Sequence, residues 1–247
     1  MSKFAYTESI DGLKAFFEGD EFQHQIKVLR RRIGNHIDFI DGRGKCYRGK
    51  ITTIDNLKQV LWVEITKTET YPKPLPLQLM VALPKSGKLD GIIQKAVELG
   101  VTKLTPLITS RTVVNISSEE KLCRKCRHWQ HIAVASLKQS GNPYLLKVDK
   151  PIDFADLEEA HEDKILSVDR IVFHPRAFDA LPVKKWKLNK DAAVRLLLGP
   201  EGGFSENEID FLRSHNYTIS SLGKRIMRLE TAVVAALTLV QFIKGNL

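Results

Sequence analysis

The amino-acid sequence predicts an α/β protein with a mainly parallel sheet, preceded by a small strand-rich domain. Predicted strands and helices alternate from residue 77 to residue 247, which is the pattern of repeated strand–helix–strand units. Pro72, Pro74 and Pro76 interrupt the chain just before that region, and three alternating prolines cannot lie in a central strand or in a helix. We therefore expect two domains, residues 1–72 and residues 73–247.

Composition limits the classes of protein to which the chain can belong. The chain has 247 residues, 43% of them hydrophobic, which is enough to bury a core and argues against wholesale disorder. Its longest apolar stretch, residues 231–243, is too short to span a bilayer. We read no signal peptide at the start, and three cysteines that cannot pair evenly suggest a reducing cytoplasm. The formal charge of +9 favours a polyanionic partner.

The first domain combines strand patterns with concentrated positive charge. Residues 37–40 and 47–54 flank the turn sequence D-G-R-G, which favours a hairpin, and residues 61–65 alternate as a half-buried strand does. Residues 27–50 carry a net charge of +6, whereas the whole of residues 1–72 carries only +2. Such a run is either a solvated face or an RNA platform, on which phosphate contacts supply affinity and register rather than sequence choice.

The second domain begins with a buried strand at residues 77–83 and a helical apolar stripe that ends before Gly100. A strand at residues 101–109, a long helix at residues 118–139 and a strand at residues 171–174 follow. The long helix contains Cys123, Cys126, His128 and His131, a set that could suggest zinc. On one continuous helix these side chains point in different directions, since each residue rotates by roughly 100 degrees, and we predict no metal.

Two glycine loops follow late in the chain. Residues 194–198 form a predicted strand that stops at Gly199, and Ser205 and Glu208 have the spacing of a helix-capping box. About twenty residues later, Gly223 ends another predicted strand before a very apolar helix that begins at Thr231. Both loops could be ordinary turns. However, Glu201 in the first loop and the cations of the second are not needed for turning, and neither phosphate-loop spacing is matched. A ligand with a ribose and a positive charge would suit Glu201 better than a polyphosphate.

Several motifs carry a resemblance to a known family. They are L-L-L-G-P-E-G-G-F-S-x-x-E (residues 196–208), L-G-x-R-I-x-R-x-E-T-A (222–232), Q-K-x-V-E-L-G (94–100), H-P-R-A (174–177) and, near the start, His24 with V-L-R and F-I-D-G-x-G. In these motifs the sequence resembles the RsmE family, the SPOUT-class methyltransferases that act on N3 of a uridine in 16S (small-subunit) ribosomal RNA with S-adenosylmethionine. The resemblance covers nearly the whole chain.

The resemblance implies a fold, a cofactor and a set of site residues. The fold would be a trefoil-knotted, mainly parallel sheet with helices on both faces, preceded by a PUA-like β-barrel that binds RNA, and the protein would be a homodimer. S-adenosylmethionine would contact the following residues: His174, Leu198, Gly199, Pro200, Glu201, Gly202, Gly203, Leu222, Gly223, Ile226 and Leu229. The motifs thereby place the cofactor across both glycine loops.

The chemistry of the implied reaction suggests catalytic residues. Methylation at N3 of uracil removes the imino proton, so cations near O2 and O4 stabilise the negative charge that develops there. Arg225 and Arg228 are suitable cations, and Glu230 could orient one of them or accept the proton; alternatively, Arg228 and Glu230 form an ion pair that only holds the turn. Contacts to RNA are expected from these residues: Lys27, Arg30, Arg31, Arg43, Lys85 and Arg111.

Two further points concern the partner and the substrate. The final helix, residues 231–243, is apolar nearly all round, so it is either buried in the core or part of a subunit interface. Where many members of the family have E-Q-x-G-R, residues 138–142 read K-Q-S-G-N, which weakens any assignment of substrate contacts to that loop. Two other functions are compatible with the fold: a non-catalytic RNA-binding factor and a methyltransferase acting on tRNA ribose. The intact Glu201, Arg225, Arg228 and Glu230 favour an enzyme over a binding factor, and the basic first domain together with H-P-R-A favours the ribosomal RNA enzyme over the tRNA enzyme.

Overall fold

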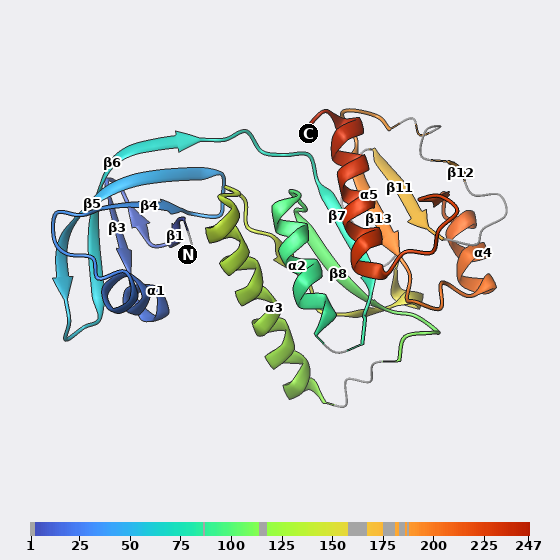
Figure 1. Ribbon diagram of the computed structural model, residues 1–247, viewed down its shortest axis with the longest axis horizontal. Helices are drawn as coiled ribbons and strands as arrows, with labels where there is room; N and C mark the ends of the chain where they lie inside the picture. The colour runs from blue at the N-terminus through green and yellow to red at the C-terminus, as the bar shows by residue number, and fades with distance from the viewer. Residues whose placement is uncertain are drawn as a thin grey trace. The chain divides into compact units, whose positions relative to one another are not determined.

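The computed structural model describes residues 3–85, 87–113, 118–157, 167–174, 181–182, 186 and 188–247. These residues form two compact units (Figure 1). The first unit contains the described residues up to Lys73 and a second segment, Val134–Leu145, whereas the second unit contains Pro74–Ala133 and Leu146–Leu247. The boundary between the two units, after Lys73, lies in the stretch that contains Pro72, Pro74 and Pro76. The later return of the chain to the first unit is a feature that the sequence pattern did not suggest.

A six-stranded sheet forms most of the first unit, in the order β1-β4-β5-β6-β3-β2. Strand β1 is parallel to β4, and the other neighbours are antiparallel. The elements are β1 Ala5–Tyr6, β2 Ile10–Asp11, β3 Lys14–Phe17, α1 Gly19–Gln23, the π-helix His24–Val28, β4 His36–Ile40, β5 Lys45–Asp55 and β6 Val60–Thr70. The predicted hairpin joins β4 to β5. Two irregularities in the β5–β6 pairing allow these long strands to bend and the sheet to curl (Figure 1).

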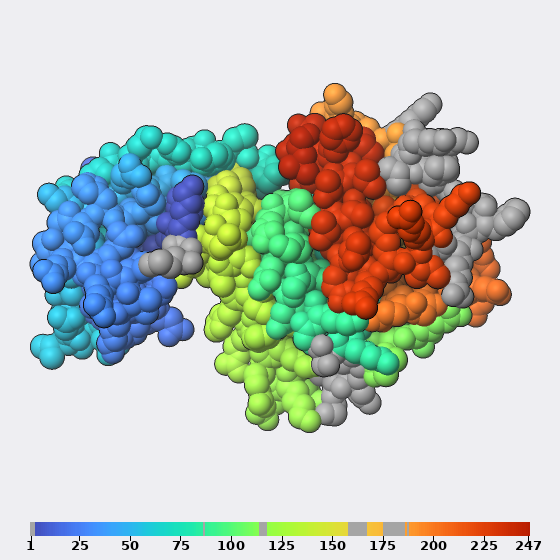
Figure 2. Space-filling view, in the orientation of Figure 1, coloured from blue at the N-terminus to red at the C-terminus, as the bar shows by residue number. Residues whose placement is uncertain are grey.

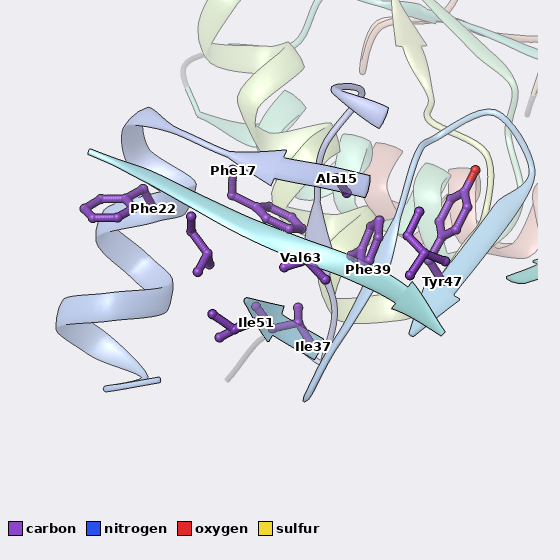
Figure 3. Close-up of a cluster of buried hydrophobic side chains, with 11 residues drawn as sticks. Ala15, Phe17, Phe22, Ile37, Phe39, Tyr47, Ile51 and Val63 are labelled. Carbon is purple, nitrogen blue, oxygen red and sulfur yellow. The ribbon is translucent and has the colours of Figure 1, made fainter. Parts of the chain in front are cut away.

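The concave side of this sheet holds a separate hydrophobic core (Figure 3). The Phe39 ring stacks on Tyr47 with centroids 4.9 Å apart and meets the edge of Phe17 at 5.3 Å. The cluster comprises Ala5, Ala15, Phe17, Phe22, Ile37, Phe39, Tyr47, Ile51, Leu61, Val63 and Ile65. Alternate residues of β5 and β6 therefore face this core, as the half-buried strand pattern at residues 61–65 predicts.

The segment Val134–Leu145 completes the first unit. The Gly44 amide donates to the Pro143 carbonyl at 2.9 Å, and the Tyr144 hydroxyl donates to the Tyr71 carbonyl at 2.8 Å. Gly44 has a φ of 101° and a Cβ placed there would lie 2.3 Å from the Tyr144 hydroxyl oxygen, so only glycine fits beneath this ring. Tyr144 thus joins the segment Val134–Leu145 to Gly44, which precedes β5, and to Tyr71, which follows β6.

Two residues that depart from the family pattern make contacts within the first unit. The Lys138 ammonium pairs with the Glu21 carboxylate at 2.6 Å, and both side chains are only about 15% exposed. The Asn142 side-chain oxygen accepts a hydrogen bond from the Tyr144 amide at 2.9 Å. The departure at these two positions is therefore accompanied by a local ion pair and a local turn.

A parallel sheet forms the centre of the second unit, in the order β10-β8-β7-β13-β11-β14-β12, with β9 also pairing with β8. All of its pairings are parallel, as predicted. The strands are β7 Leu77–Ala82, β8 Lys103–Ile108, β9 Lys147–Val148, β10 Ile152–Asp153, β11 Val168–Phe173, β12 Leu181–Pro182, β13 Ala193–Leu198 and β14 Thr218–Ser221. Because β7, β13 and β11 are central and adjacent, every described residue of β7 and β13 is buried.

Helices cover both faces of this sheet. Met80, Val172 and Leu197 lie in register on three neighbouring strands, and they pack in one cluster with Ile209 and Leu212 of α4. The alternate residues of those strands point the other way, toward the face on which α5 packs against β13 and α2 (Figure 1). The helices are α2 Lys88–Glu98, α3 Glu119–Ser140, the 3-10 turn Phe154–Asp156, α4 Glu206–Ser214 and α5 Leu229–Lys244. The α/β fold with helices on both faces is confirmed.

The predicted trefoil knot depends on the path of residues 175–187, several of which lie outside the described ranges, and it stays a prediction. Residues 175–177, the P-R-A of the H-P-R-A motif, also lie outside the described ranges.

Helix α3 contains the cysteine and histidine cluster that raised the question of zinc. It is one continuous helix, on which Cys123 contacts Glu119 and His128 pairs with Asp90 of α2 at 2.9 Å. Within the ranges that the structure describes, no group of three or more histidine, cysteine, aspartate or glutamate side chains is arranged to hold a metal ion. In the same ranges, no helix combines the length and the apolar character needed to cross a membrane.

Candidate functional site

A pocket lies in the second unit where three parallel strands end; it holds about 610 Å³ of space when the open solvent at its entrance is included. The chain leaves β11 at His174, β13 at Gly199 and β14 at Leu222, and these strands are neighbours in the sheet. The lining residues are Phe173, His174, Leu198, Gly199, Pro200, Glu201, Gly203, Ser221, Leu222, Gly223, Arg225, Ile226, Met227, Leu229 and Ala232. Ligands of open parallel sheets bind beyond the carboxyl ends of the strands, so this pocket is the candidate site.

The pocket brings together the two glycine loops that are separated in the sequence. Of the residues predicted to contact a cofactor, all except Gly202 line it; their role as ligands stays a prediction. Of the predicted catalytic residues, Arg225 lines the pocket, whereas Arg228 and Glu230 do not. The predicted set did not include four lining residues: Phe173, Ser221, Met227 and Ala232. The first three directly precede or follow a predicted residue, and Ala232 lies two positions after Glu230. Their position beside the motifs was the available signal.

The first loop is shaped by Gly203 rather than by Gly202. Gly203 has a φ of 73°, its amide donates to the Pro200 carbonyl at 2.8 Å, and a Cβ there would lie 3.0 Å from Cε1 of His174. A Cβ on Gly202 would instead meet the flexible Arg111 side chain, at 3.3 Å from its Cδ. The space left at Gly202 is therefore occupied by Arg111, and the close approach to the pocket wall belongs to Gly203.

Charged side chains from two other segments brace this loop. Arg111 donates from Nη1 to the carbonyls of Gly202 at 2.6 Å and Phe204 at 3.4 Å. Glu208 accepts hydrogen bonds from the amides of Ser110 and Ser205 at 2.8 Å and 2.7 Å. Ser205 in turn accepts from the Glu208 amide, so the predicted capping box is confirmed. Arg111 was expected to contact RNA; its contacts in the structure are to the loop, and an RNA contact stays a prediction.

The second loop presents polar and apolar groups to the same pocket. The Ser221 hydroxyl accepts from the Gly223 amide and donates to the Gly223 carbonyl, which fixes the turn at the end of β14. Arg225 and Ile226 are exposed side chains that line the pocket, and Ile226 is 67% exposed. Arg228 is the N-cap residue of α5 and is exposed. The loop therefore offers a cation and an apolar side chain at the mouth of the pocket.

An unpredicted residue, Lys88, pairs with the lining residue Glu201. Its ammonium is 3.2 Å from Oε1 of Glu201 and 3.9 Å from Oε1 of Glu230. A backbone hydrogen bond, opposed by partial burial and assisted by Lys88 and Lys85, holds the pKa of the Glu201 carboxyl below its ordinary value. Among the described residues Glu230 forms an ion pair with Lys88 and none with Arg228. The alternative in which Arg228 and Glu230 pair to hold the turn is therefore wrong.

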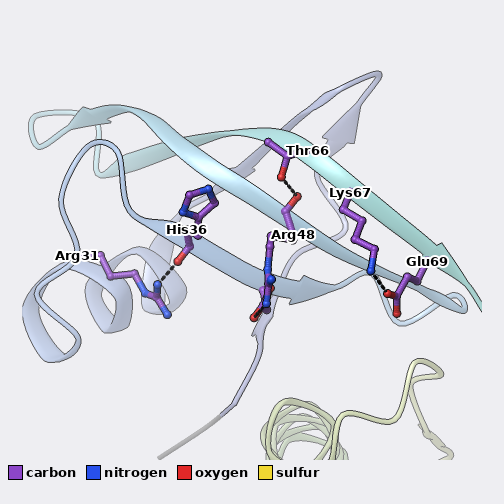
Figure 4. A network of polar contacts seen from close by, with 7 residues as sticks. Arg31, His36, Arg48, Thr66, Lys67 and Glu69 are labelled. Atoms are coloured by element: carbon purple, nitrogen blue, oxygen red, sulfur yellow. Dashed lines mark hydrogen bonds and ion pairs between the residues drawn. The ribbon is translucent and has the colours of Figure 1, made fainter.

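The first unit holds the basic residues 27–50 from which RNA contacts were predicted, and Figure 4 shows two of them, Arg31 and Arg48, with their partners. Lys27 and Arg30 are exposed and have no ion pair or side-chain hydrogen bond within the described ranges. Arg31 instead donates to the His36 carbonyl, and Arg43 pairs with Glu8 at 2.7 Å. The other cations of residues 27–50 also include both paired and exposed side chains. Arg48 pairs with Asp38, whereas Arg32, Lys45 and Lys50 are exposed. Only part of the predicted charge is thus available to a polyanion.

Comparison with known proteins places the chain among methyltransferases. The model of the RNA methyltransferase domain matches residues 71–241. Ribosomal RNA small subunit methyltransferase E from Synechocystis sp. is 32% identical over 85% of this chain and 67% of its own length, and the protein of that name from Buchnera aphidicola subsp. Schizaphis graminum is 30% identical over 92% and 89%. Among solved structures, ribosomal RNA small subunit methyltransferase E from Neisseria gonorrhoeae, bound to S-adenosylmethionine, is 26% identical with a TM-score of 0.83 and covers 98% of both chains.

Proposed function

The chain belongs to the RNA methyltransferase family, among the ribosomal RNA small subunit methyltransferase E proteins, and from this premise we propose that it methylates N3 of a uridine in small-subunit (16S) ribosomal RNA with S-adenosylmethionine. The observation that supports the proposal most is the pocket at the ends of β11, β13 and β14, where both family loops meet beside an exposed arginine.

The residues of the pocket fit S-adenosylmethionine. Leu198, Leu222 and Leu229 supply apolar surface on which an adenine can lie, and the glycine loops bring backbone N–H and C=O groups close enough to hydrogen-bond its edge. The Glu201 carboxylate at the mouth suits a ribose or a positive charge. When bound, the cofactor supplies an electrophilic methyl group on a sulfonium.

The protein's own residues then have to position the uracil and stabilise the charge that develops on it. Arg225 lines the pocket and can place its guanidinium beside O2 or O4 as the imino proton leaves N3. Glu230 does not line the pocket, but its buried Oε2 makes no hydrogen bond with any described residue, so a side-chain movement toward the pocket would be needed for it to accept that proton. Arg228, which lies outside the pocket lining, would contact the phosphate backbone or the other carbonyl oxygen.

The test of this function is incubation of the protein with methyl-labelled S-adenosylmethionine and small ribosomal subunits that lack the modification. We expect the label in 3-methyluridine after digestion to nucleosides. Label in a ribose methyl group, or transfer to tRNA alone, would support the tRNA alternative. No transfer despite RNA binding would support a non-catalytic factor.

We propose that the exposed cations of the first unit give the enzyme its affinity for RNA. Replacing Lys27 and Arg30 with glutamate should lower the affinity for small-subunit RNA and reduce the slope of log K against log salt by about 2, since two phosphate contacts are lost. The affinity for S-adenosylmethionine should not change, because these residues do not line the pocket. Filter binding at several salt concentrations measures both the affinity and the slope.

A matched variant controls for charge reversal itself. Arg43 and Arg48 already pair with Glu8 and Asp38, so their replacement by glutamate changes the net charge equally but removes cations that are neutralised locally. We expect a smaller loss of RNA affinity in this variant. Equal losses in both double variants would show that only the overall charge matters and would contradict a specific role for Lys27 and Arg30.

We further propose that the active species is a homodimer, joined in part through α5. Val233 and Leu237 are fully buried, whereas Val234, Thr238 and Phe242 form an exposed stripe along the helix. Helix α5 lies at the surface of the second unit (Figure 2), and Phe242 is 69% exposed. An exposed apolar stripe on a helix that directly follows the second pocket loop is the kind of surface that a second copy would cover.

The mass of the protein in solution tests the dimer. Light scattering should give about twice the chain mass of 28.0 kDa, and Phe242→Glu should shift the protein toward the monomer without unfolding it, because the side chain is exposed. Substitution of buried Val233 or Leu237 with aspartate would unfold the domain and would not address the interface. A concentration-independent mass near 28 kDa for the unmodified protein would refute the dimer.

A further inference from the structure

Three charged side chains from three different elements meet at the mouth of the pocket. Lys88 is the first residue of α2, Glu201 belongs to the first glycine loop, and Glu230 lies in the first turn of α5. The lysine is within hydrogen-bond distance of Glu201, at 3.2 Å, and approaches Glu230 at 3.9 Å. One cation therefore links the first loop to the first turn of α5, and both of these segments contribute residues to the pocket lining.

Lys88 occupies a position that disfavours a cation. The N-terminus of a helix carries a positive partial charge, which disfavours a lysine in the first turn. The residue before it, Gly87, provides no side-chain cap. The two carboxylates offset this repulsion. A lysine held at an unfavourable helix position by two acids from distant parts of the chain indicates a local requirement for that charge.

Helix α2 provides a fixed base for the lysine. Its apolar face, Leu89, Ile92, Ile93 and Ala96, is buried, and the helix packs against α5. No residue of α2 lines the pocket. Lys88 can therefore influence the bound cofactor through the loop and the α5 turn that it holds, rather than through the apolar lining.

We propose that Lys88 is a positioning residue of the cofactor site, which holds Glu201 of the first loop and Glu230 of α5 in the arrangement that binds S-adenosylmethionine. This inference rests on the proposed function. Lys88 holds the two carboxylates in different ways. It donates a hydrogen bond to Glu201, whereas it attracts Glu230 without a hydrogen bond. The other carboxylate oxygen of Glu230, Oε2, is buried and makes no hydrogen bond with any described residue. The lysine therefore holds Glu201 more closely than it holds Glu230.

Substitution of Lys88 tests this role. Lys88→Met should lower the affinity for S-adenosylmethionine, measured by calorimetry, by about tenfold or more, and Lys88→Arg should restore much of it. The matched control is Lys95→Met on the same helix, because Lys95 also forms an exposed ion pair, with Glu98 at 2.8 Å, but lies away from the pocket. The control should bind the cofactor as the unmodified protein does, and thermal denaturation should show both methionine variants folded.

A double-substitution cycle separates positioning from other roles. If Lys88 acts through Glu201, then Glu201→Gln and Lys88→Met should each reduce affinity, and the double variant should lose clearly less than the product of the two effects. Strictly multiplicative losses would overturn the proposal. So would an unchanged cofactor affinity in Lys88→Met together with weaker RNA binding, which would make Lys88 an RNA contact instead.

The pH dependence of cofactor binding gives a second readout. The charged groups around Glu201 are Lys88 and Lys85, with Glu230 and Arg225 nearby at the pocket mouth. Because the pKa of Glu201 is lowered, its pair with Lys88 persists above that pKa and is lost as the pH falls through it. Without Lys88 the acidic decline in affinity should begin at a higher pH, and an unshifted decline would contradict the proposal. If the unmodified protein bound no S-adenosylmethionine at all, the proposed function would fail as well.

Discussion

Replacing Gly203 with valine should lower the affinity of the protein for S-adenosylmethionine by at least about 100-fold, or ~2.7 kcal/mol. Gly203 has a φ of 73°, a region in which a β-branched residue is strained by about 1–3 kcal/mol. The new Cβ would also lie 3.0 Å from Cε1 of His174, which lines the pocket. The His174 amide is bonded to the Ser220 carbonyl at 3.0 Å, so its backbone cannot simply move away.

Two control variants separate loss of the site from general strain. Gly245→Val places the same residue at a φ of 79° with open space around the Cβ, at the end of α5 and outside the pocket. It should cost stability but not cofactor affinity. Gly202→Ala should have a small effect, because its Cβ meets only the flexible Arg111 side chain. Calorimetry on folded protein that showed equal affinity in Gly203→Val and Gly245→Val would remove the first loop from the cofactor site.

Replacing Arg225 with methionine should lower kcat for methyl transfer by about 100- to 1,000-fold, the usual effect of removing one donor that stabilises a developing oxyanion. Binding of S-adenosylmethionine should change much less, since the apolar lining and the loop backbone remain in place. The expected signature is a lower kcat at an unchanged cofactor KM, which marks an interaction made mainly in the transition state.

The neighbouring residue provides the control for Arg225. Lys224 is also an exposed cation of the second loop, but it does not line the pocket. Lys224→Met should therefore retain nearly full activity at saturating RNA. A small effect of Arg225→Met on kcat, together with a large effect on the KM for RNA, would reassign Arg225 from the reaction to substrate binding.

The sequence was informative where a pattern is local. The apolar run before Gly199, the spacing of Ser205 and Glu208 and the switch from glycine to an apolar helix after Leu222 all predicted elements that the structure contains. These signals work because a strand, a cap and a turn are each fixed by a few adjacent residues. The family motifs then brought both loops to one pocket.

The sequence was less informative where contacts join distant residues. Lys88 and Glu201 are 113 positions apart, and a lysine in a short basic loop gives no sign of a partner that far along the chain. The π-helix at His24–Val28 was also missed, because its extra residue per turn breaks the periodicity by which helices are identified. The first glycine loop contains Gly199, Pro200, Gly202 and Gly203, and composition alone does not show which of them needs a positive φ. The backbone geometry shows that it is Gly203.

The return of Val134–Leu145 to the first unit has a consequence for synthesis on the ribosome. The amino-terminal sheet is translated first, but Tyr144, which lies over Gly44, is made a hundred residues later. In the interval the strands β7 and β8, the helix α2 and most of α3 are produced. Closing so long a loop is slow compared with forming local hairpins. The nascent amino-terminal unit is therefore completed only when Val134–Leu145 has been made, and this segment lies between the two parts of the chain that form the other unit.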